Sequence, residues 1–489
     1  MALSEAELQA VRAPNTIEGL GVPPGMVEDL FMRRLITEGA MSVGEVAEAV
    51  CISHRVGIEL AEILRTKTMI EYLGAAGRDY VIQPTDLGHQ TTVQRMTAGR
   101  HVGPVPVPLE LYLTLVSAQA TEASIDRGTL REAFSDLVVD NALLDQIGPA
   151  FTSGGAIFLY GPAGTGKTSL AERLNRVVQD PVLIPRYVEV DGQIISVYDP
   201  SLHNALSPQP EGVDSRWVLC ERPLIVVGGE LDMRMLDLYH DHISGISSAP
   251  VQMLANNGIL VVDDFGRQAI RPEEILNRWI VPLSRGVDYL KSTTGSKFSV
   301  PFELKLVIST NLDPNSLGDD AFLRRLRNKI YVGPITESAF GQVLDSAAER
   351  YGVTLVEDSL ELLSTVSRRE IGELRPYLPV DFCELTNAIS RYAGVPPVFD
   401  NEMIDYVAGL YFVQADAQLP GRQVDLWSLP VAAARQPAWN DYQIGGFGAD
   451  DPMAGLDDLA MTQSIESSEH PVGVPTALQP GGMEANGAL

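Results

Sequence analysis

Hydrophobic positions in the first hundred residues recur at the three-to-four spacing of an amphipathic helix. This spacing predicts a helix over residues 26–38, which Gly39 is placed to end. Ser42 and Glu45 then form a capping-box pattern, and a second helix is expected from there to Val50. The chain therefore opens on short helices separated by turns.

A third helix and a strand are expected next. Ser53 is a suitable N-cap for a helix that would run to about Leu73, where glycines break the pattern. The alternating segment 80–83 predicts a short strand, and a last helix is expected near Met96. Three helices with a strand pair, over residues 23–100, resemble a winged-helix domain.

The charge of this first region bears on what it would bind. Residues 1–100 hold nine Lys and Arg against thirteen Asp and Glu, a net charge of −4. Attraction to phosphates would be weak, because nucleic-acid binding depends on clustered positive charge. We therefore favour a protein client or adaptor for this region, with DNA kept as the alternative.

The pattern changes four more times along the chain. Residues 101–128 begin with HVGPVPVPL, whose three prolines predict a stiff linker, and continue into a connecting helix. Buried-strand runs alternate with helical segments over 129–332, which predicts an α/β domain, and residues 333–418 have a mostly helical pattern. Residues 436–489 contain eight acidic residues and no Lys or Arg, and a disordered acidic tail is expected there.

Composition is typical of a globular protein. The chain has 489 residues, 45% of them hydrophobic, which is enough to build several cores. The formal net charge of −28 argues against non-specific coating of nucleic acid or anionic membranes. Three widely spaced cysteines argue against a disulfide framework, and no apolar run approaches the roughly 20 residues of a bilayer span. The first residues lack a signal-peptide pattern, so we expect a cytoplasmic protein with no membrane partner.

The strongest chemical signal is GPAGTGKT at residues 161–168, which fits the phosphate-loop pattern G-x-x-x-x-G-K-S/T. A strand pattern precedes it and a helix pattern follows it. Glycines let backbone N–H groups point at phosphate oxygens, Lys167 can reach the β- and γ-phosphates of ATP, and the Thr168 hydroxyl can ligate Mg²⁺. The candidate nucleotide-binding residues are Gly161, Pro162, Ala163, Gly164, Thr165, Gly166, Lys167, Thr168 and Ser169.

Two further apolar strands end in polar side chains. The segment 258–262 leads into Asp263 and Asp264, and the segment 306–310 leads into Asn311. In an open α/β sheet such strand ends face the ligand crevice. Asp263 is the candidate Mg²⁺ ligand, Asp264 is the candidate for polarising the attacking water, and Asn311 could orient that water or sense the γ-phosphate. Taken singly, Asp263 could instead be a capping residue and Asn311 a turn residue.

These segments, followed by the run DAFLRRLR at 320–327, occur in the order found in AAA+ ATPases, and residues 129–418 resemble that superfamily. The resemblance implies a five-stranded parallel sheet, ATP bound between the sheet domain and a helical lid, and a homo-oligomeric ring, usually a hexamer. It also implies an arginine that reaches the neighbouring subunit's γ-phosphate. Arg325 and Arg324 match the paired arginines of that motif, and Arg327 is a weaker candidate. A basic helix end is the other interpretation.

The run 276–301 is similar to a finer group within that superfamily. MoxR-like ATPases and bacterial enhancer-dependent transcription activators carry an extra hairpin ahead of the strand that ends in Asn311. This hairpin commonly faces the central pore. Lys291, Ser292 and Lys297 would then be exposed at its tip, unless the run is an ordinary surface hairpin.

Three features depart from the AAA+ pattern. The second acidic residue is usually Glu, and Asp264 is one methylene shorter, which predicts slow hydrolysis or compensation by its loop. The lid position that often carries an arginine is Val380 here, and Arg375 is a poor substitute in sequence. The segment after Thr168 is longer than the fold needs, and Glu230 within it is either a loop residue or a second catalytic carboxylate.

The predicted fold is a phosphate-loop α/β domain with a parallel sheet and an α-helical lid, preceded by a small α+β domain. The predicted function is Mg²⁺-dependent ATP hydrolysis by a ring that remodels or moves a bound macromolecule. Two alternatives remain open: a DNA-directed ATPase or regulator that uses the winged-helix-like domain, and a slowly hydrolysing nucleotide switch or scaffold.

Overall fold

The computed structural model describes residues 11–77, 79–97, 99–120, 125–314 and 326–412. All of them fall in the first of two units of the chain, Met1–Ala432, and the second unit, Ala433–Leu489, is outside the described residues. The predicted acidic tail at 436–489 therefore also lies outside them. Buried apolar side chains of the described residues form five clusters, two of which lie on opposite faces of one sheet.

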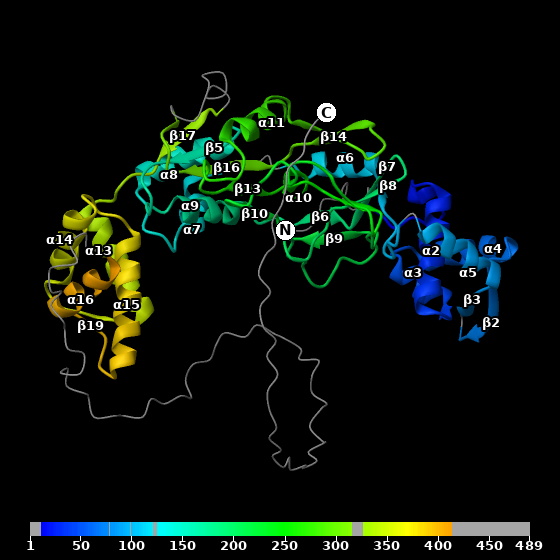
Figure 1. Cartoon of the computed structure of the whole chain (residues 1–489), viewed down its shortest axis with the longest axis horizontal. Coiled ribbons are helices and arrows are strands. Elements are labelled where there is room, and N and C mark those ends of the chain that lie inside the picture. The colour runs from blue at the N-terminus through cyan, green and yellow to red at the C-terminus, as the bar shows by residue number, and fades with distance from the viewer. Residues whose placement is uncertain (1–10, 78, 98, 121–124, 315–325, 413–489) are drawn as a thin grey trace, which may run out of the picture. The chain divides into compact units, whose positions relative to one another are not determined.

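The central element is a sheet of five parallel strands, which confirms the predicted sheet (Figure 1). In spatial order the strands are β10 (Leu224–Val227), β13 (Ile259–Val262), β16 (Lys305–Thr310), β5 (Ile157–Tyr160) and β17 (Asn328–Tyr331). The first strand in sequence, β5, lies between the fourth and the fifth. The strand order therefore changes direction beside β5, and ligands of open α/β sheets bind at the carboxyl ends of the strands at such a point.

Helices cover both faces of this sheet because its strands are apolar on both sides. Along β13, Ile259 and Val261 pack into one cluster, whereas Leu260 and Val262 pack into another. The first face is covered by α7 (Arg127–Ala133), α8 (Asn141–Thr152) and α9 (Lys167–Arg173), and the second by α10 (Val251–Leu254) and α11 (Pro272–Arg285). The sheet is thus the middle layer of three, and its ends remain free for a site.

Four strands of the long segment between α9 and β13 form a second, mixed sheet together with one short strand that precedes α9 in sequence. Its strands, in spatial order, are β11 (Tyr239–Asp241), β12 (Ile246–Ser248), β8 (Gln193–Ser196), β7 (Tyr187–Val190) and β4 (Val107–Pro108). A separate strand pair consists of β6 (Val182–Pro185) and β9 (Trp217–Cys220). Side chains of α6 (Leu109–Ala118) share one buried cluster with this pair and with the second sheet. The proline-rich segment is therefore not a free spacer, because its Val107 pairs with Val188 of the second sheet.

The predicted hairpin is present as β14 (Val287–Lys291) and β15 (Lys297–Pro301). Lys291 and Lys297 are exposed, but the expectation that Ser292 is exposed at the tip is wrong, because only 4% of Ser292 is exposed. The turn packs on the turn between β7 and β8. There Ser296 Oγ donates to Asp191 Oδ2 over 2.6 Å, and Gln193 bonds to Thr293. The tip is therefore held by a neighbouring sheet.

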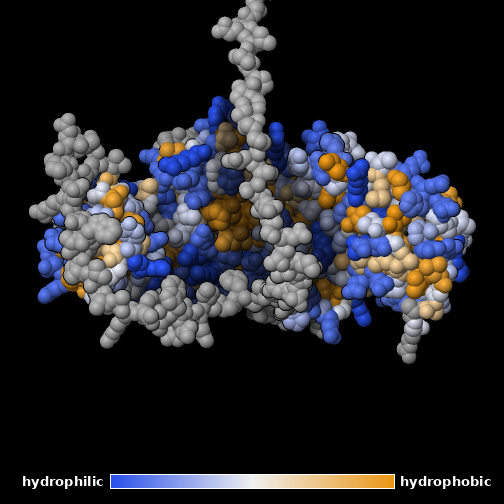
Figure 2. Space-filling view, turned by 60° about the horizontal axis from the view of Figure 1, so that its bottom comes forward, coloured by the Kyte–Doolittle hydropathy of each residue, from blue (hydrophilic) through white to orange (hydrophobic). Residues whose placement is uncertain are grey.

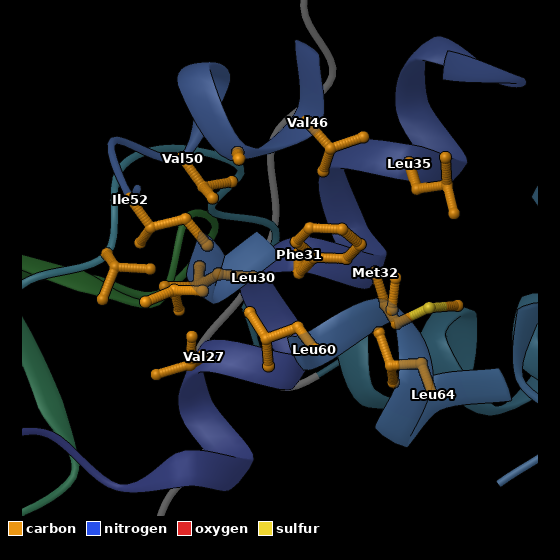
Figure 3. Packing of buried hydrophobic residues seen from close by; sticks show 14 of the residues in the cluster. Val27, Leu30, Phe31, Met32, Leu35, Val46, Val50, Ile52, Leu60 and Leu64 are labelled. Carbon is orange, nitrogen blue, oxygen red and sulfur yellow. The ribbon is translucent and has the colours of Figure 1, made fainter. Parts of the chain in front are cut away.

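The N-terminal region contains short helices and a three-stranded antiparallel sheet. Its elements are η1 (Glu18–Leu20), α2 (Pro24–Glu38), β1 (Met41–Ser42), α3 (Val43–Ala49), α4 (His54–Thr66), β2 (Ile70–Ala76), β3 (Asp79–Pro84) and α5 (Asp86–Met96). Figure 3 shows Phe31 of α2 surrounded by apolar side chains of the neighbouring elements. Ser42 and Glu45 form the predicted capping box at the start of α3.

One expected boundary in this region is wrong. The third helix was expected to run to about Leu73, but α4 ends at Thr66 and residues 70–76 form β2. Thr68 has a φ of 56°, which is incompatible with a continuing right-handed helix. Tyr72 then pairs with Ile82 of β3, so cross-strand pairing overrides the helical spacing of the sequence.

The C-terminal part of the described chain is helical, as the pattern predicts. It contains α13 (Glu337–Tyr351), α14 (Ser359–Glu370), α15 (Tyr377–Ala393) and α16 (Asn401–Tyr411), with one short strand pair, β18 (Thr354–Leu355) and β19 (Val398–Phe399). Phe340, Phe382 and Phe399 are fully buried at the centre of these helices. This group therefore has its own core.

The surface is mostly polar, with apolar residues in separate groups. On the face drawn in Figure 2, hydrophobic residues lie in patches between hydrophilic ones. Tyr392 and Ile243 are the most exposed large apolar residues of the described chain, at 81% and 72%. Across the ranges that the structure describes, no helix is both long and apolar enough to cross a bilayer.

Candidate functional site

The glycine-rich loop after β5 folds back over the strand end. Gly161, Gly164 and Gly166 have φ values of 141°, 77° and 88°, which side-chain-bearing residues rarely adopt. Two of them also have no room for a side chain. A Cβ on Gly161 would lie 2.3 Å from Val332 O, and one on Gly164 would lie 2.2 Å from the Tyr377 ring. The loop therefore needs glycine at these points to adopt this backbone path.

Lys167 is the buried cation of the loop. It is 6% exposed, and its Nζ donates to Gly161 O at 3.1 Å, Pro162 O at 2.7 Å and Asn311 Oδ1 at 2.8 Å. Burial lowers the pKa of this amine, while the carboxylates of Asp263 and Asp264 act in the opposite direction. The three acceptors are neutral, so the ammonium retains attraction for an anion placed beside it.

Thr168 and Asp263 bring two oxygen ligands together. The Thr168 hydroxyl donates to Asp263 Oδ2 over 2.8 Å, and the Asp263 backbone N–H donates to Val227 O of the neighbouring strand over 2.8 Å. A carboxylate and a hydroxyl are the hard oxygen ligands that Mg²⁺ uses together with nucleotide phosphates and water. These two side chains therefore fit the ion that the resemblance implies.

Asp264 and Asn311 form the next contact of the site. Asn311 Nδ2 donates to Asp264 Oδ1 over 3.1 Å, while its Oδ1 accepts from Lys167. One amide therefore connects the loop lysine with the second acidic residue. Asp264 has a φ of 46°, a left-handed conformation that aspartate tolerates better than most residues. Arg267 lies 3.7 Å from its other oxygen.

Gln268 is a residue of the site that sequence analysis missed. Its Nε2 donates to Asp263 O at 3.0 Å and to Gly228 O at 3.3 Å, and its Oε1 accepts from the Gly266 N–H at 2.7 Å. The side chain thus joins the ends of β10 and β13 and closes the turn that carries Asp264. No motif marks it, because its partners are backbone groups brought together by the fold.

Arg375 also lies at the loop, although its position in the sequence gave it little weight. Its Nη1 donates to Ala163 O over 2.9 Å, and its guanidinium pairs with Glu373 at 2.8 Å. Val380, at the position where the resemblance implies an arginine, packs against the cluster of the helical region. Arg375 is therefore the described arginine that the helical region brings to the glycine loop.

The other candidates are placed as follows. Arg324 and Arg325 lie outside the described residues, and Arg327 is exposed. Glu230 lies at the end of β10, where its Oε1 accepts from the Gly228 N–H at 2.8 Å. Ser169 is half-buried on α9. In the part of the chain that the structure describes, no group of three His, Cys, Asp or Glu side chains could form a separate metal site.

The site therefore combines a glycine loop, a buried lysine, a carboxylate–hydroxyl pair, and a second carboxylate beside an amide. They come from the carboxyl ends of three neighbouring strands: β5, β13 and β16. Such a set can bind a phosphate chain, hold a divalent cation against it and position a water molecule.

Comparisons with known proteins add little to this geometry. Residues 336–409 match the model of a domain of unknown function, DUF8689, and a search of curated proteins gives no match. Among solved structures, the chain is similar to the RuvB Holliday junction branch migration motor of Thermotoga maritima, at 13% identity and a TM-score of 0.30. That match covers 58% of this chain and 70% of the other. A variant of the same RuvB gives 12% identity and a TM-score of 0.32 over 61% and 74% of the two chains. Likeness at this level carries no functional argument, so the site is interpreted from its own residues.

Proposed function

We propose that this protein is a Mg²⁺-dependent ATPase of the AAA+ type. The observation that carries the proposal is the meeting of Lys167, Thr168, Asp263, Asp264 and Asn311 at one edge of the parallel sheet, through hydrogen bonds of 2.8–3.1 Å. These residues come from three segments that are distant in sequence, and their side chains supply the groups that phosphoryl transfer to water requires.

Each residue has a distinct role in this proposal. The backbone of residues 161–169 cradles the phosphates, and Lys167 neutralises charge on the β- and γ-phosphates. Thr168 and Asp263 hold Mg²⁺, which supplies positive charge to the phosphate oxygens when bound. Asp264 accepts the proton of the attacking water, and Asn311 fixes the position of that water.

The larger assembly follows from the resemblance and is part of the same proposal. The chain forms a homo-oligomeric ring, a hexamer, in which Arg325 or Arg324 of one subunit reaches the γ-phosphate of the next. Residues 129–332 act as the ATPase domain, residues 333–418 as its lid, and residues 23–100 as a winged-helix-like module that recruits a protein client in the cytoplasm.

A second candidate function is a nucleotide switch that hydrolyses slowly. Two observations favour it. Asp264 is shorter than the usual glutamate, and its Oδ1 already accepts a hydrogen bond from Asn311 at 3.1 Å. A carboxylate engaged in this way is less available as a base until Asn311 moves. In this form, ATP binding and not turnover would change the state of the ring.

The decisive experiment measures ATP binding and steady-state ATP turnover of the full chain. We expect the wild type to bind Mg²⁺-ATP and hydrolyse it, and Lys167→Ala to lose both activities. Lys297→Ala, which removes an exposed lysine of the hairpin, is the matched control and should behave as wild type. Unchanged turnover in Lys167→Ala would contradict the assignment of this site as an ATPase site. ATP binding with negligible turnover in the wild type would favour the nucleotide switch.

The shared-site proposal has its own test. Arg325→Ala and Asp264→Asn subunits should each be inactive alone. In mixed rings, an intact arginine meets an intact acidic residue at some interfaces, so part of the turnover should return. Mixing that restores no activity would contradict an arginine acting across the interface. The DNA alternative is tested by a gel shift of the full chain with duplex DNA at low and at moderate salt. Absence of DNA binding would remove this alternative.

A further inference from the structure

A cavity of about 400 Å³ lies at the edge of the central sheet opposite to the glycine loop. Gly155 ahead of β5, Gly258 ahead of β13 and Lys305 at the start of β16 contribute to its wall. Since these strands are parallel, this is the amino edge, opposite to the glycine loop. The cavity is therefore separate from the proposed ATP site, and its size is in the range of small-molecule sites.

Lys305 is the notable group of this cavity. Its Nζ donates to Phe151 O over 2.7 Å and lies 5.1 Å from the centre of the Phe151 ring. No carboxylate of the described residues forms an ion pair with it. Burial accordingly lowers the pKa of this amine to about 8. A partly buried ammonium whose hydrogen-bond partners are neutral has no counter-ion. An anion bound in the cavity would supply the opposite charge.

The other charged groups of the wall restrict what that anion can be. Arg222 is already neutralised, because its Nη2 lies 2.6 Å from Asp180 Oδ2 and its Nη1 donates to Asn257 O at 2.6 Å. Glu303 forms no ion pair within the described part of the chain, and burial raises the pKa of its carboxyl group. A doubly charged anion would face this carboxylate, whereas a singly charged one can be balanced by Lys305.

The remaining wall combines polar and apolar surface, and Thr152, Asn175 and Asn257 supply polar groups to it. Carbon-rich side chains come from α8, from the turn after α9 and from the approach to β16, and they are Phe151, Leu174, Val178, Phe302 and Leu304. A ligand that fits them carries an apolar body next to its charged end, because small-molecule sites combine such walls with a few polar contacts.

We propose that this cavity binds a small organic monocarboxylate. Lys305 is the counter-ion of the carboxylate, the apolar side chains of the wall contact the body of the ligand, and Glu303 excludes phosphate and other dianions. This site is independent of ATP hydrolysis and does not rest on the proposed function.

Benzoate is a suitable probe, and isothermal titration calorimetry of the full chain is the measurement. We expect saturable binding of one benzoate per chain at neutral pH, weakened about tenfold or more in Lys305→Met and retained in Lys305→Arg. Lys297→Met, on the exposed hairpin, controls for the loss of one positive charge and should bind as wild type. Absence of saturable binding, or equal affinity in Lys305→Met and wild type, overturns the proposal.

Two further measurements do not depend on how well Lys305→Met folds. In the wild type, bound benzoate should slow modification of Lys305 by trinitrobenzenesulfonate, located by mass spectrometry, without slowing modification of Lys297. In Glu303→Gln, inorganic phosphate should bind, although the wild type rejects it, and benzoate should bind more tightly. Unchanged labelling of Lys305, or phosphate binding that is the same in both proteins, contradicts the assigned roles.

Discussion

The Thr168 hydroxyl donates a hydrogen bond to Asp263 Oδ2 over 2.8 Å, although 95 residues separate them in sequence. Thr168 follows the loop lysine on α9, and Asp263 ends the strand β13. Their contact places the end of the phosphate loop and the first acidic residue in one crevice. Each of the two side chains offers an oxygen atom to the same point.

This contact predicts how the protein depends on Mg²⁺. Thr168→Val keeps the shape of the side chain and removes its oxygen, so we expect the Mg²⁺ concentration for half-maximal ATPase activity to rise about tenfold or more. Thr168→Ser keeps the oxygen and is the matched control. The measurement is a Mg²⁺ titration of turnover at saturating ATP, and equal Mg²⁺ requirements in all three proteins would contradict the assignment of Thr168 as a ligand.

Asp264 makes a second prediction, in which activity and stability separate. Asp264→Asn preserves the tolerance for a φ of 46° but cannot accept the proton of water. We expect turnover to fall about 10²–10⁴-fold with ATP binding and unfolding unchanged. Asp264→Ala should lose turnover equally and also lose about 1 kcal/mol of stability, because alanine disfavours the left-handed region.

The two variants are compared by ATP turnover and by denaturant unfolding of the same preparations. Equal denaturant midpoints for Asp264→Asn and Asp264→Ala would show that the left-handed backbone conformation does not destabilise the alanine variant. Turnover retained in Asp264→Asn would remove Asp264 as the base and leave Glu230, the exposed carboxylate at the end of β10, as the candidate to test next.

Sequence patterns predicted the parts of this site whose chemistry depends on contiguous residues. The glycines and Lys167 are close in sequence because a phosphate loop is one turn of chain, and Asp263 and Asn311 are found at the ends of strands that are apolar throughout. Gln268 and Arg375 could not be found in this way. Their partners are the carbonyl groups of Asp263 and Ala163, and only the fold determines which carbonyl a side chain reaches.

The fold was predictable to a similar extent. Regular spacing predicted the helices of the C-terminal region, and continuous apolar runs predicted the central strands β5, β13 and β16. The helix expected up to Leu73 and the exposed position expected for Ser292 were wrong for one reason. Tyr72 pairs with β3, and the turn at Ser292 packs on the second sheet, and both contacts join segments whose partners local spacing does not identify.

Gln268 makes a third prediction, as a positioning residue. Gln268→Ala removes the bonds to Asp263 O and to the Gly266 N–H, and should loosen the turn that carries Asp264. We expect kcat to fall about tenfold with little change in KM for ATP, because the phosphate loop itself is untouched. Gln268→Glu keeps the acceptor but loses the donor, and should be intermediate. A rise in KM with kcat preserved would contradict a role confined to the acidic turn.

Arg375 makes a fourth prediction, in which the opposite parameter changes. Its guanidinium donates to the carbonyl of Ala163 in the glycine loop. Arg375→Ala should therefore weaken ATP binding about tenfold, because a cation is lost beside the phosphates. Arg375→Lys keeps the charge and should recover part of the affinity. Binding of a fluorescent ATP analogue measures this directly, and equal affinity in wild type and Arg375→Ala would assign the arginine to a purely structural contact.

Lys305 makes the last prediction, which concerns pH. Burial lowers the pKa of its amine from 10.5 to about 8 in the folded protein, and the unfolded chain has the ordinary value. Between these two values the unfolded state binds more protons, so this group makes stability rise with pH; below about pH 8 its full penalty is present. Lys305→Met lacks the penalty. The free energy of unfolding of Lys305→Met in urea should therefore exceed that of wild type most near neutral pH, and the difference should shrink by about pH 10.

Arg222 and Glu303 face the same cavity in both proteins, so their contributions cancel in the comparison. Lys297→Met reports the effect of net charge alone. A stability difference between Lys305→Met and wild type that stays constant or grows with pH would show that burial of the charged Lys305 amine does not destabilise the fold.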